Sequence, residues 1–163
     1  MAKVYNVLFV CTGNSARSIL AEALLNDAGS GRFRAWSAGS QPTGAVSPKA
    51  LETLRILGVS AAGARSKSWD EFAAPDAPAM DFVITVCDNA AGEVCPFWPG
   101  EPMTAHWGLP DPAAVRGSDA DILQAFRDAA VTLRRRIDLL LALPMAALDA
   151  MAARRELRDI GAR

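Results

Sequence analysis

Cysteine, histidine and tyrosine are scarce in this chain of 163 residues, which has three cysteines, one histidine and one tyrosine. The cysteines lack the close C-x2–4-C pairing that is typical of structural zinc sites. Charge of one sign is not in excess either, because 17 basic and 18 acidic residues leave a formal net charge of -1. A chain without a broad basic field does not attract nucleic acid, so no nucleic-acid partner is expected.

Long apolar runs are also missing. No segment reaches the roughly twenty apolar residues that span a bilayer, and the stretch IDLLLALPMAAL is short and interrupted by Pro144. The apolar run near the start is too short for a signal peptide and no small-residue cleavage site follows it. We therefore expect a cytoplasmic protein without a membrane partner, in which cysteines are reduced and any disulfide is catalytic.

Four apolar segments rich in β-branched and aromatic residues predict strands, and they span residues 4–10, 33–39, 81–87 and 103–108. The first is nearly all apolar, which is typical of a central parallel strand buried on both faces. Ligands of a parallel sheet bind beyond the carboxyl ends of its strands. Cys11 and Cys87 each fall at such an end, so we expect both to face one crevice.

Helical spacing of apolar residues separates these strands. Ser47 is the predicted N-cap of one helix and Pro48 its first residue. A capping box over Ser118–Asp121 predicts the start of a long helix. Strands that alternate with helices predict an α/β protein with a parallel sheet. We expect one domain over residues 1–143, a helical extension or tail over 144–163, and a monomer.

The stretch CTGNSARS, residues 11–18, joins the first predicted strand to a helix. Backbone N–H groups in such a loop converge on an anion, and the guanidinium of Arg17 offers a planar fork for two oxygens of a tetrahedral oxyanion. A helix N-terminus and a nearby arginine lower a cysteine pKa, which predicts that Cys11 is a thiolate nucleophile. The alternative is a buried cysteine beside a solvent-exposed arginine. The predicted oxyanion-binding residues are Thr12, Gly13, Asn14, Ser15, Ala16, Arg17 and Ser18.

The segment VLFVCTGNSARS resembles the active-site loop of low-molecular-weight protein tyrosine phosphatases and of the arsenate reductases that share their fold. The resemblance covers about residues 4–142 in element order. It implies a single-domain, three-layer fold with a four-stranded parallel sheet flanked by helices, and no organic cofactor. It also implies that Cys11 is the nucleophile and that Arg17 binds the oxyanion. In this family the aspartate of an Asp-Pro pair, here Asp111, is the general acid that protonates the leaving oxygen.

Two features favour the arsenate reductases within this resemblance. Tyrosines that flank a phosphotyrosine ring commonly follow the Asp-Pro pair in the phosphatases, whereas Ala113 and Ala114 follow it here. The reductases carry a cysteine pair after the corresponding strand and an HWG segment before the Asp-Pro pair. This chain has Cys87 and Cys95 in that loop and HWG at residues 106–108. The alternative for both cysteines is a role as small buried apolar residues.

The resemblance implies a relay of three thiols. The Cys11 thiolate attacks arsenate, Cys87 attacks the Cys11 sulfur with release of arsenite, and Cys95 then attacks Cys87. The final reductant is thioredoxin, or glutathione with glutaredoxin if Cys95 takes no part. Two other functions stay open: a phosphatase for phosphotyrosine or small phosphoesters, and a non-catalytic oxyanion or redox sensor that signals through Cys87 and Cys95.

Two further groups of polar residues need an interpretation. Some members of the family bind potassium near the loop through asparagine, glutamate and aspartate. Asn14 and Glu22 match two of these positions, but Lys67 and Ser68 lie near the third, so no metal is predicted. The run 134–136, three consecutive arginines, is interpreted as a solvated helix face.

Overall fold

Four parallel strands form one sheet at the centre of the protein. The computed structural model describes residues 4–87, 102–144 and 160–161. The strands lie in the order β2-β1-β3-β4, and every neighbouring pair is parallel. Their bounds are Tyr5–Cys11 for β1, Phe33–Gly39 for β2, Phe82–Thr85 for β3 and Met103–His106 for β4. The predicted α/β fold with a four-stranded parallel sheet is confirmed.

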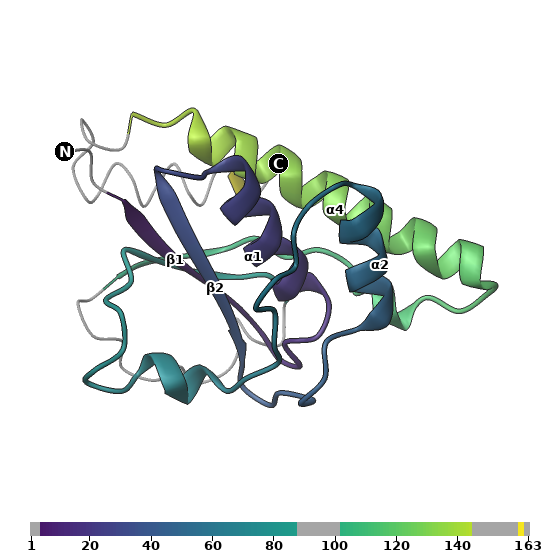
Figure 1. The fold of residues 1–163 in the computed structure, drawn as a ribbon, viewed down its shortest axis with the longest axis horizontal. Helices are drawn as coiled ribbons and strands as arrows, with labels where there is room; N and C mark the ends of the chain where they lie inside the picture. Colours follow the sequence, from purple (N-terminus) through teal and green to yellow (C-terminus); the bar gives the residue numbers. More distant parts are fainter. Residues whose placement is uncertain (1–3, 88–101, 145–159, 162–163) are drawn as a thin grey trace.

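Helices lie on both sides of this sheet. The described part includes the α-helices α1 (Arg17–Ala28), α2 (Pro48–Ile56) and α4 (Asp119–Leu141), and the 3-10 helices η1 (Trp69–Phe72) and η2 (Pro112–Ala114). In Figure 1, α1, α2 and α4 lie above the sheet and η1 lies below it. Of the helices that the structure describes, none is long and apolar enough to cross a membrane.

The strand β1 is buried on both faces, as its continuous apolar sequence predicts. Val7, Leu8 and Phe9 are consecutive, so their side chains alternate between the two faces, and each is 0% exposed. A strand with both faces covered lies in the interior of a parallel sheet. The sheet order places β1 between β2 and β3.

The strands β3 and β4 are shorter than the predicted segments 81–87 and 103–108, because they end at Thr85 and His106. Main-chain pairing continues for one more residue in each case. The N–H of Val86 donates to the carbonyl of Val10 at 2.9 Å, and the N–H of Trp107 donates to that of Thr85 at 2.7 Å. The following residues, including Cys87, therefore lie just beyond the carboxyl edge of the sheet.

The predicted capping box opens α4. The N–H of Asp121 donates to Ser118 Oγ at 3.1 Å, and the N–H of Ser118 donates to Asp121 Oδ2 at 3.2 Å. At the start of α2, by contrast, Pro48 is the first helical residue as predicted, but the Ser47 side chain makes no capping hydrogen bond. The Ser47 N–H donates instead to the carbonyl of Ser15 at 2.9 Å, which ties the start of α2 to the loop after β1.

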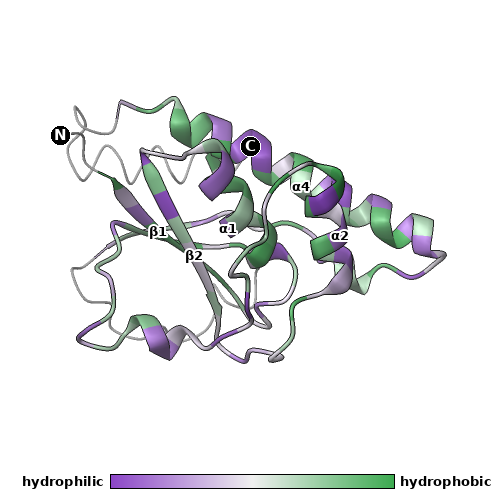
Figure 2. Cartoon of the chain, in the orientation of Figure 1, coloured by the Kyte–Doolittle hydropathy of each residue, from purple (hydrophilic) through white to green (hydrophobic). Residues whose placement is uncertain are grey.

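The buried side of α4 includes an arginine. Polar and apolar stretches alternate along this helix in Figure 2, as expected for a helix with one buried face. Arg136 is only 7% exposed, so the interpretation of residues 134–136 as a solvated face is wrong for this position. The reason is helical phase: Arg136 follows the buried Ala129 and Leu133 by seven and three residues and precedes the buried Leu140 by four.

The end of the chain returns to the sheet. Ile160 is 3% exposed and belongs to the same apolar core as the strands. A Cβ atom placed on Gly161 would lie 2.2 Å from the carbonyl oxygen of His106 and 2.7 Å from Trp107 Cδ1, so its backbone packs directly on the end of β4. Residues 145–159 lie outside the described part, and the division of the chain at residue 144 stays a prediction.

Candidate active site

Cys11 is the last residue of β1, and the loop that follows it leads into α1. Two backbone features set the shape of this loop. Asn14 has a φ of 48°, in the left-handed region that asparagine tolerates better than most residues. A Cβ atom on Gly39, at the end of β2, would lie 2.4 Å from the Thr12 carbonyl oxygen. Only glycine allows β2 to approach the loop this closely.

The Cys11 sulfur is buried and surrounded by hydrogen-bond donors. It lies 3.0 Å from Ser18 Oγ and accepts the Asn14 N–H at 3.2 Å. The Asn14 side-chain amide donates to Ser18 Oγ at 2.8 Å, which leaves the Ser18 hydroxyl proton for the sulfur. The amide is oriented in turn by the Lys67 N–H, which donates to Asn14 Oδ1 at 2.9 Å. A connected set of donors therefore points at the sulfur that the sequence identifies as the nucleophile.

Cys87 lies against the same loop, although 76 residues separate it from Cys11. Its sulfur accepts the Thr12 N–H at 3.2 Å and lies 3.6 Å from Thr12 Oγ1. Both cysteines are free thiols and both are buried. The neighbouring positions of β1 and β3 in the sheet bring them to one crevice, as the strand ends predict. Cys95 lies outside the described residues.

The second thiol changes the acidity of the first. Hydrogen bonding to Cys87 and then burial raise the pKa of Cys11 well above its ordinary value, whereas Ser18 and the Asn14 N–H act to lower it. The expected lowered pKa is therefore wrong for this arrangement. Burial disfavours the charged thiolate, and the neighbouring Cys87 thiol adds to this effect. The Arg17 guanidinium, which would favour a thiolate, is bound to the Leu109 carbonyl instead.

The Arg17 guanidinium points to the loop that carries Asp111. Its Nη1 donates to the Leu109 carbonyl at 2.9 Å, and its Nη2 lies 3.7 Å from Asp111 Oδ2. The Asp111 side chain is 41% exposed and also accepts the Ala113 N–H at 2.9 Å, at the start of η2. The structure thus brings Asp111 next to Arg17, which lies 94 residues earlier in the sequence.

The N-terminus of α1 faces this crevice without a side-chain cap. Ala16 is its N-cap residue, no side chain makes a capping hydrogen bond, and the first turn contains no acidic residue. The orphan N–H groups and the partial positive charge of a helix start suit an anion. The arrangement is therefore able to hold a tetrahedral oxyanion above the Cys11 sulfur, with a carboxyl group close by.

A buried ion pair lies behind the loop. Lys67 Nζ is 3.8 Å from Glu22 Oε1, with the two side chains 5% and 14% exposed. The Ser37 hydroxyl donates to Glu22 at 3.2 Å, and Lys67 Nζ donates to the Arg65 carbonyl at 3.0 Å. Burial raises the pKa of Glu22 and lowers that of Lys67. The ammonium thus stands beside the carboxylate that the sequence analysis compared with a potassium ligand.

Sequence reasoning missed two contributions to this site. It noted Lys67 only as a mismatch to a metal ligand, and it placed Arg136 on a solvated face, although Arg136 Nη1 donates to the Gly108 carbonyl at 3.0 Å, close to Asp111. The helical spacing of Arg136 from the apolar Leu133 and Leu140 could have predicted that it is buried. Among the residues that the structure describes, no group of three or more His, Cys, Asp or Glu residues is placed to hold a metal ion.

Known proteins share this fold and this sequence pattern. The chain is 33% identical over 131 residues to an arsenate reductase of Halalkalibacterium halodurans, which covers 80% of this chain and 91% of the relative. It is 31% identical to an arsenate reductase of Bacillus subtilis, over 71% of this chain and 79% of the relative.

Solved structures give the same picture. An arsenate reductase in the phosphate binding state superposes with a TM-score of 0.69 at 29% identity, covering 85% of this chain and 98% of that one. A low molecular weight protein tyrosine phosphatase from T. tengcongensis gives a TM-score of 0.67 at 25% identity, covering 84% and 97%. The family model for low molecular weight phosphotyrosine protein phosphatase matches residues 6–154. With the Cys11 loop, the Asp-Pro pair and the parallel sheet in place, the chain belongs to the low molecular weight phosphotyrosine protein phosphatase family.

Proposed function

We propose that this protein reduces arsenate to arsenite through a relay of cysteine thiols. The observation that carries the proposal is the position of Cys87, whose sulfur lies 3.2 Å from the Thr12 N–H in the loop that begins at Cys11. A hydrolytic phosphatase needs one nucleophilic thiol in this crevice, whereas a reductase needs a second thiol to take up the oxidation. The curated relatives of Halalkalibacterium halodurans and Bacillus subtilis are arsenate reductases.

In the first step, the Cys11 thiolate attacks arsenate that is held by residues 12–18 and by the Arg17 guanidinium. A sulfur–arsenic bond forms and one arsenic–oxygen bond breaks. Asp111 gives its proton to the departing oxygen, which leaves as water, because a poor leaving group needs protonation in the transition state. Ser18 and the Asn14 N–H, both at hydrogen-bond distance from the sulfur, stabilise the thiolate before the attack.

In the second step, Cys87 attacks the Cys11 sulfur. A Cys11–Cys87 disulfide forms, the sulfur–arsenic bond breaks, and the bonding electron pair stays on arsenic, which leaves as arsenite. Arsenic is reduced by two electrons and the two thiols are oxidised to one disulfide. Thiol exchange of this kind is limited by thiolate fraction and by access, and the Cys87 sulfur lies against Thr12, the residue next to Cys11.

In the third step, Cys95 attacks Cys87, and Cys11 leaves as a thiolate that is ready for the next arsenate. An external thiol then reduces the Cys87–Cys95 disulfide. We propose thioredoxin as this reductant. If Cys95 takes no part, glutathione with glutaredoxin instead reduces the Cys11–Cys87 disulfide and regenerates both thiols. A thioredoxin-dependent arsenate reductase of Corynebacterium glutamicum is one of the structural relatives, with a TM-score of 0.56 at 29% identity over 83% of this chain.

Phosphatase activity is the second candidate, because a loop built for a tetrahedral oxyanion with an adjacent carboxyl group also suits a phosphoester. The T. tengcongensis phosphatase supports this possibility. Ala113 and Ala114 in η2 provide no aromatic wall for a phosphotyrosyl ring. We therefore expect slow hydrolysis of small aryl phosphates rather than efficient cleavage of phosphotyrosine.

One set of assays tests the proposal. NADPH oxidation is followed with arsenate, first with thioredoxin and its reductase, then with glutathione, glutaredoxin and glutathione reductase, and aryl phosphate hydrolysis is measured in parallel. We expect Cys87→Ser to abolish arsenate turnover and to spare hydrolysis, whereas Cys11→Ser abolishes both. Loss of thioredoxin-driven turnover in Cys95→Ser supports the three-thiol path. Arsenate turnover that survives in Cys87→Ser would contradict the relay, and no turnover with any donor would favour a phosphatase or a sensor.

A further inference from the structure

Arg136 is a buried cation that the proposed chemistry does not use. It projects from the apolar side of α4, where Leu133 and Ile137 are fully buried. Replacement of buried charges by apolar side chains of similar size is often neutral or stabilising, so core packing does not account for an arginine here. A leucine or methionine would fill the same space without the cost of desolvating a guanidinium.

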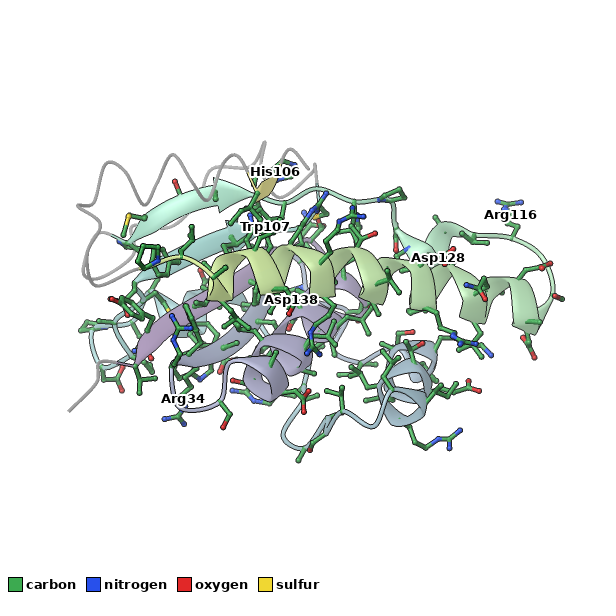
Figure 3. All side chains as sticks on the ribbon, turned by 90° about the horizontal axis from the view of Figure 1, so that it is seen from above. Arg34, His106, Trp107, Arg116, Asp128 and Asp138 are labelled. Atoms are coloured by element: carbon green, nitrogen blue, oxygen red, sulfur yellow. The ribbon has the colours of Figure 1, made fainter. Side chains whose placement is uncertain are left out.

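The guanidinium of Arg136 binds the main chain of the segment that carries the proposed general acid, Asp111. Its Nη1 donates to the Gly108 carbonyl at 3.0 Å, three residues before Asp111. Its Nε is buried and has no hydrogen-bond partner among the residues that the structure describes. Trp107, which precedes Gly108, is fully buried, and Figure 3 shows its side chain behind α4.

Two arginines from two helices thus hold successive carbonyls of the segment 108–111. Arg136 of α4 binds the Gly108 carbonyl, and Arg17 of α1 binds the Leu109 carbonyl at 2.9 Å. In the proposed reaction, the fork of Arg17 turns to the oxyanion, and the Leu109 carbonyl loses this donor. Arg136 keeps its place because its side chain is buried on α4 and does not reach the oxyanion through the Cys11 loop.

We infer that Arg136 is a positioning residue, which keeps the segment 108–111 and hence Asp111 in place while Arg17 is engaged with the oxyanion. The inference rests on the proposed role of Asp111 as general acid. It predicts that loss of the guanidinium loosens this one segment and misplaces the acid, while the Cys11 loop still binds oxyanions.

Hydrogen exchange of the intact protein tests the structural half of this inference. In Arg136→Met we expect amides of residues 107–115 to exchange about 10-fold faster than in the wild type, with the strands unchanged. Arg127→Met, at an exposed position of the same helix, is the matched control and is expected to exchange like the wild type. Arg136→Lys, which keeps the charge but not the fork, serves if the methionine variant fails to fold. Unchanged protection of residues 107–115, or faster exchange everywhere, would overturn the inference.

Hydrolysis of two aryl phosphates tests the catalytic half. A general acid matters more for a poor leaving group, so kcat/KM for phenyl phosphate should fall about 10-fold more than for 4-nitrophenyl phosphate in Arg136→Met. Asp111→Asn should shift the ratio in the same direction. If Asp111→Asn shifts the ratio and Arg136→Met does not, the positioning role is wrong. If Asp111→Asn leaves the ratio unchanged, the proposed acid is wrong, and the exchange experiment alone decides whether Arg136 orders the segment.

Discussion

At the residue scale, the acidity of Cys11 depends on what lies within hydrogen-bond distance of its sulfur. Cys87 and burial act against the thiolate, and Ser18 with the Asn14 N–H act for it. The thiolate is the reactive form of a cysteine, so the groups that raise this pKa oppose the reactivity of Cys11 and those that lower it favour that reactivity. In this structure the Arg17 guanidinium is bound to the Leu109 carbonyl and lies beside Asp111, so the donors at the sulfur are Ser18 and the Asn14 N–H.

Removal of the second thiol tests this balance. We expect Cys87→Ala to lower the pKa of Cys11, so that its alkylation by iodoacetamide reaches half of the maximal rate at a lower pH. Ser18→Ala removes a donor and should shift the profile to higher pH. Mass spectrometry of the Cys11 peptide separates this reaction from that of the other cysteines. Shifts in the same direction for both variants would contradict the assignment.

The buried pair of Glu22 and Lys67 makes a second prediction. Burial raises the folded-state pKa of Glu22, so the folded protein binds this proton more tightly than the unfolded chain does. Protonation of Glu22 therefore contributes to the free energy of unfolding at low pH, and this contribution is lost as pH rises through the folded-state pKa. Lys67→Met removes the cation that lowers this pKa, so it should cost about 3 kcal/mol at pH 7 and clearly less at pH 5. Urea unfolding at both pH values measures the difference. The double variant Lys67→Met/Glu22→Gln should recover part of the loss at pH 7, and equal costs at both pH values would contradict this account.

At the element scale, the start of each helix reflects a different need. The N-terminus of α4 is closed by its capping box, that of α2 is tied by main chain to the Cys11 loop, and that of α1 is open toward the crevice. A helix that binds an anion must leave its N–H groups free, whereas a structural helix gains from a cap. The open start of α1 is therefore the one suited to an anion, whereas the start of α4 is capped and that of α2 is tied to the loop after β1.

Two serines at helix starts provide a matched pair of variants. We expect Ser118→Ala to destabilise the protein by about 1 kcal/mol, because it removes the hydrogen bond to the Asp121 N–H. Ser47→Ala should change stability by less than about 0.5 kcal/mol, since this side chain makes no capping bond. Thermal or urea unfolding reports both values. A larger cost for Ser47→Ala than for Ser118→Ala would refute the distinction.

At the scale of the whole molecule, the sheet brings together groups that are distant in sequence. Cys11 ends β1, Cys87 follows β3 and Asp111 follows β4, and these strands end at one edge. Parallel strands place all their carboxyl ends on the same side, so each loop contributes a different group to one crevice. Arg17, on the helix that follows β1, completes the set.

The chain terminus also belongs to this scale. Ile160 is buried in the common core, so Ile160→Ala should cost about 2 to 4 kcal/mol, as for other large-to-small core changes. Val131→Ala, at an exposed position of α4, is the control and should lie within about 0.5 kcal/mol of the wild type. Denaturant unfolding with a single transition measures both. A negligible cost for Ile160→Ala would support a loosely attached tail over residues 144–163.

Local patterns were sufficient to predict the sheet, most helix starts and the identity of the Cys11 loop. The capping box at Ser118–Asp121 and the apolar run of β1 each depend on a few consecutive residues, so they can be recognised from the local sequence alone. The ends of β3 and β4 were predicted too late, because a buried apolar residue follows each strand. Val86 and Trp107 each make one more main-chain hydrogen bond, and the apolar pattern therefore continues past the end of the strand. At Ser47 the side-chain cap is missing, and the main-chain N–H makes a tertiary bond to the Ser15 carbonyl that local patterns do not predict.

The sequence by itself determined the α/β class and the loop that carries Cys11 and Arg17, because these depend on residue type and local spacing. The candidate roles of Asp111 and Cys87 came from the resemblance of the sequence to a known family. Only the tertiary structure decided the raised pKa of Cys11, the pairing of Glu22 with Lys67 and the burial of Arg136. Acidity and desolvation depend on which groups from distant segments come within a few ångströms. That proximity is a property of the folded chain and not of any short stretch of it.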